Sequence, residues 1–179
     1  MATVQERLTK AFRLDGDTWL RHANPWSVYT RIPIPAALTA AVWSRRWIGR
    51  WSVVPVVAVC GWTWVNVRAF PAPRSLDHWA SKAVLGERMW SEVENAPLAA
   101  RHRTAVAILT GANSLGLPLI VWGTWALRGW VLATGLAVQT FGKLWTLDRM
   151  VWFYEDVTHD RAEKAARPAS VALATDAAV

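Results

Sequence analysis

The sequence predicts an all-α membrane protein, a polytopic helix bundle with about four spanning helices and one interfacial amphipathic helix. Of its 179 residues, 53 % are hydrophobic and only 18 % are charged. Several apolar runs approach the about 20 residues that a helix needs to cross a bilayer. The chain also has 14 Trp, mostly at the ends of apolar runs. An indole ring at a membrane interface is buried while its N–H stays hydrated.

Four segments are predicted to span the membrane. They cover residues 32–44, 47–67, 104–127 and 129–150. The first is short for a full crossing, so a hairpin turned at residues 44–49 and a shallower re-entrant hairpin both fit the pattern. In the third, Ala112 and Gly116 form a small-xxx-small pair that allows close helix packing. Asn113 is expected to hydrogen-bond to a neighbouring helix, and this packing role is favoured over binding of a ligand.

The spans form one domain, residues 32–156, between two terminal segments. Residues 1–31 are charged and weakly amphipathic, which is typical of a segment at the membrane interface. Residues 76–93 carry two Trp on one side of a helical wheel, which predicts a helix in the interface plane or packed against the bundle. Residues 157–179 are rich in Ala and charged side chains, and we expect a disordered tail there.

The net charge of +7 is explained by the membrane better than by nucleic acid. The Lys and Arg residues flank the apolar runs and do not gather in one basic patch. Most fall on the side that holds both ends of the chain, so the positive-inside rule places both termini in the cytoplasm and the protein in the cytoplasmic membrane. The single Cys60 allows no internal disulfide and gives no sign of a metal site.

The most polar stretch of the apolar region is residues 142–156. Trp145, Arg149 and Trp152 share one stripe of the predicted helix, which allows Arg149 to stack on an indole. An ionisable group in a spanning helix is a functional candidate, because an unpaired charge there is costly. Asp148 is expected to pair with Arg31, or else with Arg68 or Arg103. The alternative is that the Lys and Arg side chains snorkel and the aromatic rings form an interfacial belt.

No motif for catalysis, nucleotide binding or metal binding is present in the chain. The four histidines are His22, His78, His102 and His159, and none lies at the middle of a predicted span. We expect each of them to be solvated or interfacial, which argues against a haem held between helices. No cofactor and no metal are indicated, and whether the protein is an enzyme stays open.

Two motifs resemble an uncharacterised family, a domain of unknown function among small bacterial and archaeal integral membrane proteins. The first is Asn24-Pro25-Trp26-Ser27 with Arg31. The second is Lys143-Leu144-Trp145 followed by Leu147-Asp148-Arg149-Met150 and Trp152. The resemblance covers about residues 12–156. It implies a membrane protein but no activity, cofactor or partner. The candidate polar cluster consists of Asn24, Trp26, Arg31, Lys143, Asp148, Arg149 and Trp152.

Three hypotheses for function follow from these patterns. The first is a non-enzymatic accessory or assembly subunit or a small carrier, with membrane lipid and a partner membrane subunit or a second copy as partners. The second is a membrane-embedded enzyme that acts on a lipid or other amphiphile through a polar pocket around Asp148, Lys143 and Arg149. The third is a soluble helical protein with a very apolar core.

Overall fold

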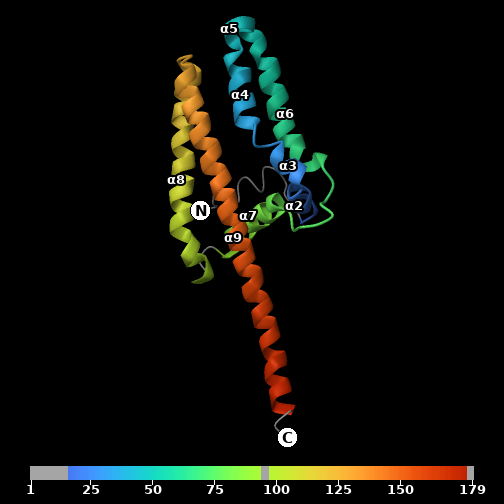
Figure 1. Cartoon of the computed structure of the whole chain (residues 1–179). Coiled ribbons are helices and arrows are strands. Elements are labelled where there is room, and N and C mark those ends of the chain that lie inside the picture. The colour runs from blue at the N-terminus through green and yellow to red at the C-terminus, as the bar shows by residue number, and fades with distance from the viewer. Residues whose placement is uncertain (1–15, 94–96, 177–179) are drawn as a thin grey trace.

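The computed structural model describes residues 16–93 and 97–176, and every regular element in these ranges is a helix (Figure 1). The predicted all-α class is therefore confirmed for the described chain. The first fifteen residues of the predicted interfacial segment, and the last three of the predicted tail, lie outside the described residues. In chain order the elements are α2 (Gly16–His22), α3 (Pro25–Tyr29), α4 (Ile34–Trp43), α5 (Arg45–Ile48), η1 (Gly49–Ser52), α6 (Val53–Ala69), α7 (Trp79–Val93), α8 (Pro97–Trp125) and α9 (Gly129–Asp176).

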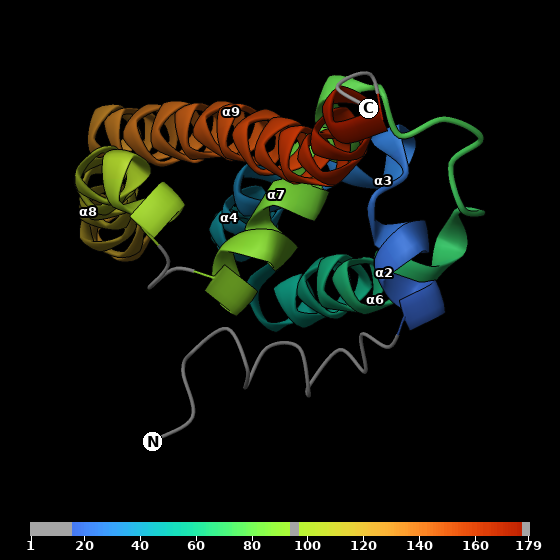
Figure 2. The same ribbon diagram turned by 90° about the horizontal axis from the view of Figure 1, so that it is seen from below.

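Two helical hairpins form the frame of the molecule. Helices α4 and α6 are joined through α5 and η1, and helices α8 and α9 are joined by residues 126–128. Both hairpins turn at the same end of the molecule, which we call the turn end (Figure 1). Helices α2, α3 and α7 lie at the opposite end of the α4–α6 hairpin, beside the middle of α9. Seen from below, α8 and α9 lie on one side, α6 and α2 on the other, and α7 between them (Figure 2).

Glycines set the distance between α8 and α9. A Cβ atom on Gly116 would lie 2.7 Å from the carbonyl oxygen of Gly135, and one on Gly142 would lie 2.9 Å from the Cα of Asn113. Real side chains do not tolerate such contacts, so only glycine lets the two backbones touch here. Gly86 plays the same part between α7 and α9, because its Cβ position is occupied by the backbone carbonyl of Met150.

Buried apolar side chains gather at the level of α2, α3 and α7. One cluster joins Ala23 and Val28 to Ala80 and Val84, a second joins Ala83 to Leu147 and Val151, and a third joins Ala99 to Phe153 and Val157. The apolar face of α7 therefore packs on protein. Of the two arrangements predicted for residues 76–93, the structure has the helix packed against the bundle. A buried hydrogen bond of 3.0 Å from Ser27 Oγ to Asn66 Oδ1 also ties α3 to the end of α6.

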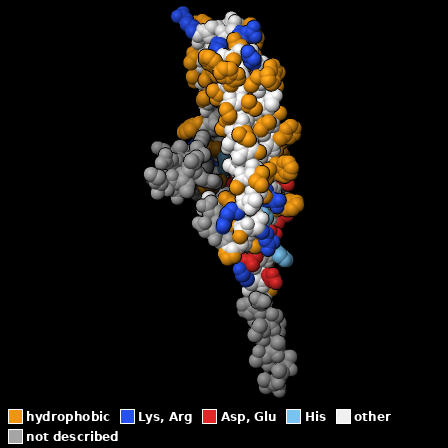
Figure 3. Space-filling view, turned by 90° about the vertical axis from the view of Figure 1, so that its left-hand side faces the viewer, with side chains coloured by type: hydrophobic (Ala, Val, Ile, Leu, Met, Phe, Trp, Pro, Cys, Tyr) orange, Lys and Arg blue, Asp and Glu red, His pale blue; other side chains and the backbone are white. Residues whose placement is uncertain are grey.

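The hairpins themselves expose apolar side chains along their outer surfaces. The most exposed include Val53, Val57, Ile108, Leu115, Val121 and Phe141. Figure 3 shows such side chains covering the molecule between Lys and Arg residues at the turn end and a band of charged residues lower down. Two stretches, Pro25–Ala69 and Pro97–Trp125, are long and apolar enough to cross a membrane. That test rests on length and composition.

Helix α8 begins at Pro97, seven residues before the predicted third span, and three further elements differ from the predicted boundaries. Helix α4 has 10 residues, about 15 Å, so it covers about half of a hydrocarbon core. The predicted second span begins later, at Val53, because Gly49 takes a positive φ of 55° and separates α5 from η1. Helix α9 continues through the segment predicted as a disordered tail, as far as Asp176. Ala, Glu, Lys and Arg favour helix there, and Lys164 pairs with Asp160 one turn away at 2.7 Å.

Candidate binding cavity

A cavity of about 490 Å³ lies where α7, α8 and α9 face the start of the α4–α6 hairpin. Its polar lining consists of His22, Arg31, Thr63, Glu87, Asn113, Gln139, Thr140 and Lys143, and we call it the polar cavity. These residues come from the end of α2, the turn after α3, and helices α6, α7, α8 and α9. Apolar side chains such as Val28, Ile32 and Leu144 complete the wall. The site is thus assembled from segments that lie far apart in the sequence.

His22 and Arg31 form one pair in the polar cavity. The Arg31 guanidinium contacts both ring nitrogens of His22, with 3.0 Å from Nη1 to Nε2, and Nη2 donates to the His22 carbonyl oxygen at 3.3 Å. Burial, together with the positive charges of Arg31 and Lys143, lowers the pKa of His22 from 6.5 to about 3. His22 is therefore neutral at pH 7, and it accepts a hydrogen bond from Arg31.

Lys143 and Glu87 form the second pair. Lys143 Nζ donates to Glu87 Oε1 at 2.6 Å. The pair depends on the close approach of α7 to α9, because Glu87 follows Gly86, whose Cα faces the backbone of Met150. Of the ionised groups that line the cavity, Arg31 and Lys143 are positive and Glu87 is negative. Since His22 is neutral, positive charge exceeds negative charge in the cavity.

Two amide side chains also belong to the polar lining. The buried atoms Asn113 Oδ1 and Gln139 Oε1 have no hydrogen-bond partner among the described residues. Both side chains start from the glycine-lined contact of α8 with α9, because Gly142 packs on Asn113 and Gly116 packs on Gln139. Buried polar atoms in native proteins are nearly always bonded to protein or to water. The two amides of the cavity wall thus have hydrogen-bonding capacity that the described residues do not satisfy.

The predicted polar cluster is divided among several places. Arg31 and Lys143 line the polar cavity. Asn24 caps α3, since its Oδ1 accepts from the backbone N–H of Trp26 at 2.9 Å, and its Nδ2 donates to the carbonyl oxygen of Pro71 at 2.9 Å. The Trp26 side chain is 68 % exposed.

The remaining members of the predicted cluster are not among the residues that line the polar cavity. Asp148 Oδ1 accepts a hydrogen bond from the indole Nε1 of Trp79 at 3.0 Å. The Arg149 guanidinium stacks over the exposed ring of Trp152, 4.9 Å from its centroid, as the helical stripe predicted. The expected partner of Asp148 was Arg31, which binds His22 in the structure. Of the three residues given for an enzyme pocket, Lys143 alone lines the cavity, which weakens that hypothesis.

Several lining residues were not assigned to a site from the sequence. Asn113 was given a packing role, and Gln139 interrupts the apolar run of the fourth predicted span. Glu87 is one of several charged residues on α7, and its spacing carries no signal. His22 lies in a polar segment and was expected to be solvated. Polar side chains inside apolar runs were the signal that sequence reasoning could have used for Asn113 and Gln139.

The expectation that every histidine is solvated or interfacial is wrong for His102. Its side chain is 3 % exposed, and its Nε2 lies 2.9 Å from Asp156 Oδ2, which also accepts from Arg101 at 3.3 Å. The ring packs edge-on against Phe153, with 5.4 Å between centroids. This cluster fixes the start of α8 to α9. Within the described ranges, no group of three or more His, Cys, Asp or Glu side chains is placed to hold a metal ion.

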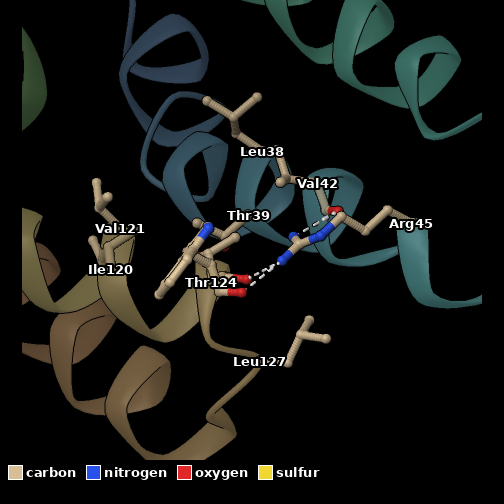
Figure 4. Close-up of a pocket in the computed structure, with 9 residues that line it drawn as sticks. Leu38, Thr39, Val42, Arg45, Ile120, Val121, Thr124 and Leu127 are labelled. Atoms are coloured by element: carbon tan, nitrogen blue, oxygen red, sulfur yellow. Dashed lines mark hydrogen bonds between the residues drawn. The ribbon is translucent and has the colours of Figure 1, made fainter. Parts of the chain in front are cut away.

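A second hollow of about 810 Å³ follows the polar cavity along α4, between this helix and α8 (Figure 4). We call it the apolar groove. It is lined by Leu38, Thr39, Val42, Arg45, Ile120, Val121, Thr124, Trp125 and Leu127, and it is open along one side. Ile34 and Pro35, one turn earlier on α4, line the polar cavity. The two hollows are thus neighbours along the same helix.

Arg45 closes the groove at the turn end. Its Nη2 donates to the carbonyl oxygens of Thr124 at 2.7 Å and Trp125 at 3.0 Å (Figure 4). These carbonyls belong to the last turn of α8 and have no partner within the helix. A cation at a helix C-terminus is also favoured by the helix dipole. Arg45 therefore joins the two hairpins at the turn end.

The fold and the cavity define an all-α protein with two stretches long and apolar enough to cross a membrane and a polar cavity between its helices. The chain belongs to a family of unknown function, DUF6653, whose model matches residues 3–172. The match extends beyond residues 12–156, where the motifs suggested a resemblance to a family of unknown function. No curated protein and no solved structure matches the chain.

Proposed function

We propose that the chain is a four-span integral membrane protein, a small carrier or accessory subunit that holds a polar or amphiphilic molecule in the polar cavity. The observation that carries this proposal is the polar cavity itself. It combines ionised side chains with two unpartnered amide oxygens between helices whose outer surfaces are apolar. Ionisable residues in such a place are costly to keep, and in membrane proteins they mark paths and binding sites.

The outer surfaces of the hairpins support a membrane location. Large apolar side chains such as Val57, Leu115 and Phe141 are exposed on α6, α8 and α9. Soluble monomers rarely expose contiguous apolar patches larger than a few hundred Å². In a membrane, lipid covers such a surface, so the apolar side chains avoid the free-energy cost of contact with water.

Tryptophans support the placement of the two membrane surfaces. Exposed indoles gather at the turn end, namely Trp47, Trp51, Trp122, Trp125 and Trp130, and others lie lower on α9, namely Trp145 and Trp152. Trp130 and Trp152 are separated by about 33 Å along the axis of α9. This separation suits a hydrocarbon core of about 30 Å with an aromatic belt at each interface.

In this proposal the crossings are made by α4 with the turn before it, α6, α8 and the first part of α9. Arg45, Arg46, Arg50 and Arg128 lie at the turn end, and most of the other Lys and Arg residues lie toward the opposite end. The positive-inside rule then places the turn end outside the cell and both termini in the cytoplasm. The cytoplasmic membrane is the proposed location.

Thiol labelling in intact cells tests the topology. Cys60 is exposed, so it is first replaced in Cys60→Ser. Arg46→Cys in that background should react with a membrane-impermeant maleimide in intact cells, and Lys164→Cys should react only after permeabilisation. The reverse pattern contradicts the orientation. Recovery of the protein in the aqueous phase without detergent overturns the membrane proposal.

Native mass spectrometry of the protein in mild detergent tests the binding role. A carrier should retain a small molecule at one copy per chain, whereas an accessory subunit should arrive with a membrane partner or a second copy of itself. The protein is purified from cells that need it for growth under the conditions used. A chain that then carries neither a small molecule nor a partner protein contradicts both roles.

A further inference from the structure

The polar cavity and the apolar groove together indicate what kind of molecule is bound. We infer that the ligand is a monoanionic amphiphile whose hydroxyl-bearing head lies beside Arg31 and whose hydrocarbon tail lies between α4 and α8. The inference rests on the proposed membrane location and on the proposed binding role of the cavity. It adds the chemical class of the ligand and the direction in which it lies.

The charge of the cavity selects an anion. Lys143 is neutralised by Glu87 at 2.6 Å, but the hydrogen bonds of Arg31 go to the uncharged His22. A guanidinium has five N–H donors in a planar fork, which matches a carboxylate or a phosphate diester. Glu87 is the negative group that acts on Arg31, but its hydrogen-bonded partner is Lys143. The two cations therefore share one carboxylate, and one further negative charge beside Arg31 restores the balance.

The amide side chains of the cavity indicate which further groups the head of the ligand carries. Asn113 Oδ1 and Gln139 Oε1 are buried acceptors without donors. Once each amide turns toward the cavity that its residue lines, a head with hydroxyl groups can supply both missing hydrogen bonds, whereas a phosphodiester group has no O–H and supplies none. Positive charge from Arg31 and acceptors from Asn113 and Gln139 thus fit a negatively charged group that is linked to hydroxyls, as in a glycerol phosphodiester.

The groove provides a place for the tail. It follows the polar cavity along α4, from Leu38 through Val42 to Arg45, a rise of about 10 Å. Its walls on α8 are Ile120 and Val121, and it is open along one side. In a membrane that open side faces acyl chains, so an amphiphile enters from the bilayer with its head directed to the cavity.

The test is a binding titration followed by native mass spectrometry. Wild-type protein in mild detergent is titrated with phosphatidylglycerol, with phosphatidylcholine, and with inorganic phosphate. Phosphatidylglycerol should bind one copy per chain at least about tenfold more tightly than phosphatidylcholine, because the Arg31 contact is charge-assisted. Both lipids have a phosphodiester and two tails, so the comparison isolates net charge and head-group hydroxyls.

Two variants change the charge of the cavity in opposite directions. Arg31→Gln should weaken the binding of phosphatidylglycerol at least about tenfold. Glu87→Gln frees Lys143 and should tighten it. Partial unfolding lowers affinity in both variants, so opposite signs distinguish charge from loss of structure. Arg46→Gln, exposed at the turn end, is the matched control and should bind as the wild type does.

A third variant tests the tail. Val121 lines the groove, and its side chain is 66 % exposed, so Val121→Trp fills the groove with little effect on folding. It should weaken lipid binding and leave any binding of inorganic phosphate unchanged. Equal affinity for the two lipids, or displacement of lipid by inorganic phosphate at similar concentrations, overturns the amphiphile assignment. If a different small molecule is retained at one copy per chain, the binding role stands and this assignment fails. If a folded membrane protein retains no small molecule, the binding role itself fails.

Discussion

Gly86 is the position where a single methyl group should disturb both the fold and the cavity. Its Cβ position coincides with the backbone carbonyl of Met150, so Gly86→Ala forces α7 away from α9. A backbone cannot give way as a side chain does, and overpacking of this kind costs about 1–3 kcal/mol. Alanine returns about 1 kcal/mol through its higher helix propensity. With the cost at the upper end of that range, the expected net loss is about 2 kcal/mol, which lowers Tm by about 4–8 °C for a chain of this size.

Gly111→Ala is the matched control for this change. Gly111 lies within α8, and a Cβ atom there meets nothing within 4 Å. The gain in helix propensity is then not opposed, and stability should rise by up to about 1 kcal/mol. Thermal unfolding followed by circular dichroism in one detergent compares the two variants with the wild type. The reasoning about close helix contact is refuted if both variants melt at the same temperature.

Three further predictions concern single contacts. The pKa of His22 is about 3 in the folded chain, whereas an unperturbed histidine has a pKa of 6.5. The unfolded state therefore binds more protons than the folded state between these two pH values. His22 therefore makes stability fall as pH drops from about 6.5 to about 3, by at most about 1.4 kcal/mol per pH unit, and His22→Gln should flatten this part of a stability–pH profile. Arg45→Gln removes a cation from the last carbonyls of α8 and should cost about 1–2 kcal/mol in a denaturant titration, whereas Arg46→Gln should change stability by less than about 0.5 kcal/mol. Trp79→Phe removes the hydrogen-bond donor to Asp148 and should cost about 1–3 kcal/mol. The same substitution in an Asp148→Ala background should cost less, and an equal loss in the two backgrounds would show that this hydrogen bond contributes nothing.

The main elements of the fold were readable from the sequence because they depend on local composition. The apolar run after residue 104 predicted most of α8, and the predicted break at residue 128 lies within the linker 126–128 that joins α8 to α9. Gly116 was assigned to a close helix contact, and it packs on Gly135. Each of these predictions used neighbours within a few turns of one helix.

The polar cavity was only partly predictable, because its residues meet through tertiary packing. Arg31 and Lys143 were selected as ionisable groups beside or within apolar runs, and both line the cavity. Glu87 reaches Lys143 only because Gly86 lets α7 touch α9, and the sequence of α7 does not show which helix it faces. Asp148 was expected to pair with an arginine, yet it accepts a hydrogen bond from the indole of Trp79, which a charge-based argument does not consider.

The length of α9 illustrates a different limit. Charged and Ala-rich residues after Asp156 fit a disordered tail and a solvated helix equally well by composition. The structure gives a helix that continues to Asp176, with Val157 still packed against Phe153 and Ala99 at its start. Packing at one end of such a segment allows helix propensity to act over the following turns.

A crystal structure grown from a lipid mesophase tests the central claim most directly. The account predicts electron density for one amphiphile, with its head within hydrogen-bond distance of Arg31, Asn113 and Gln139. Its tail should follow α4 past Val42 toward the turn end. The two hairpins should be surrounded by lipid. A polar cavity filled only by water, with α4 packed against α8 so that the apolar groove is closed, would contradict the account.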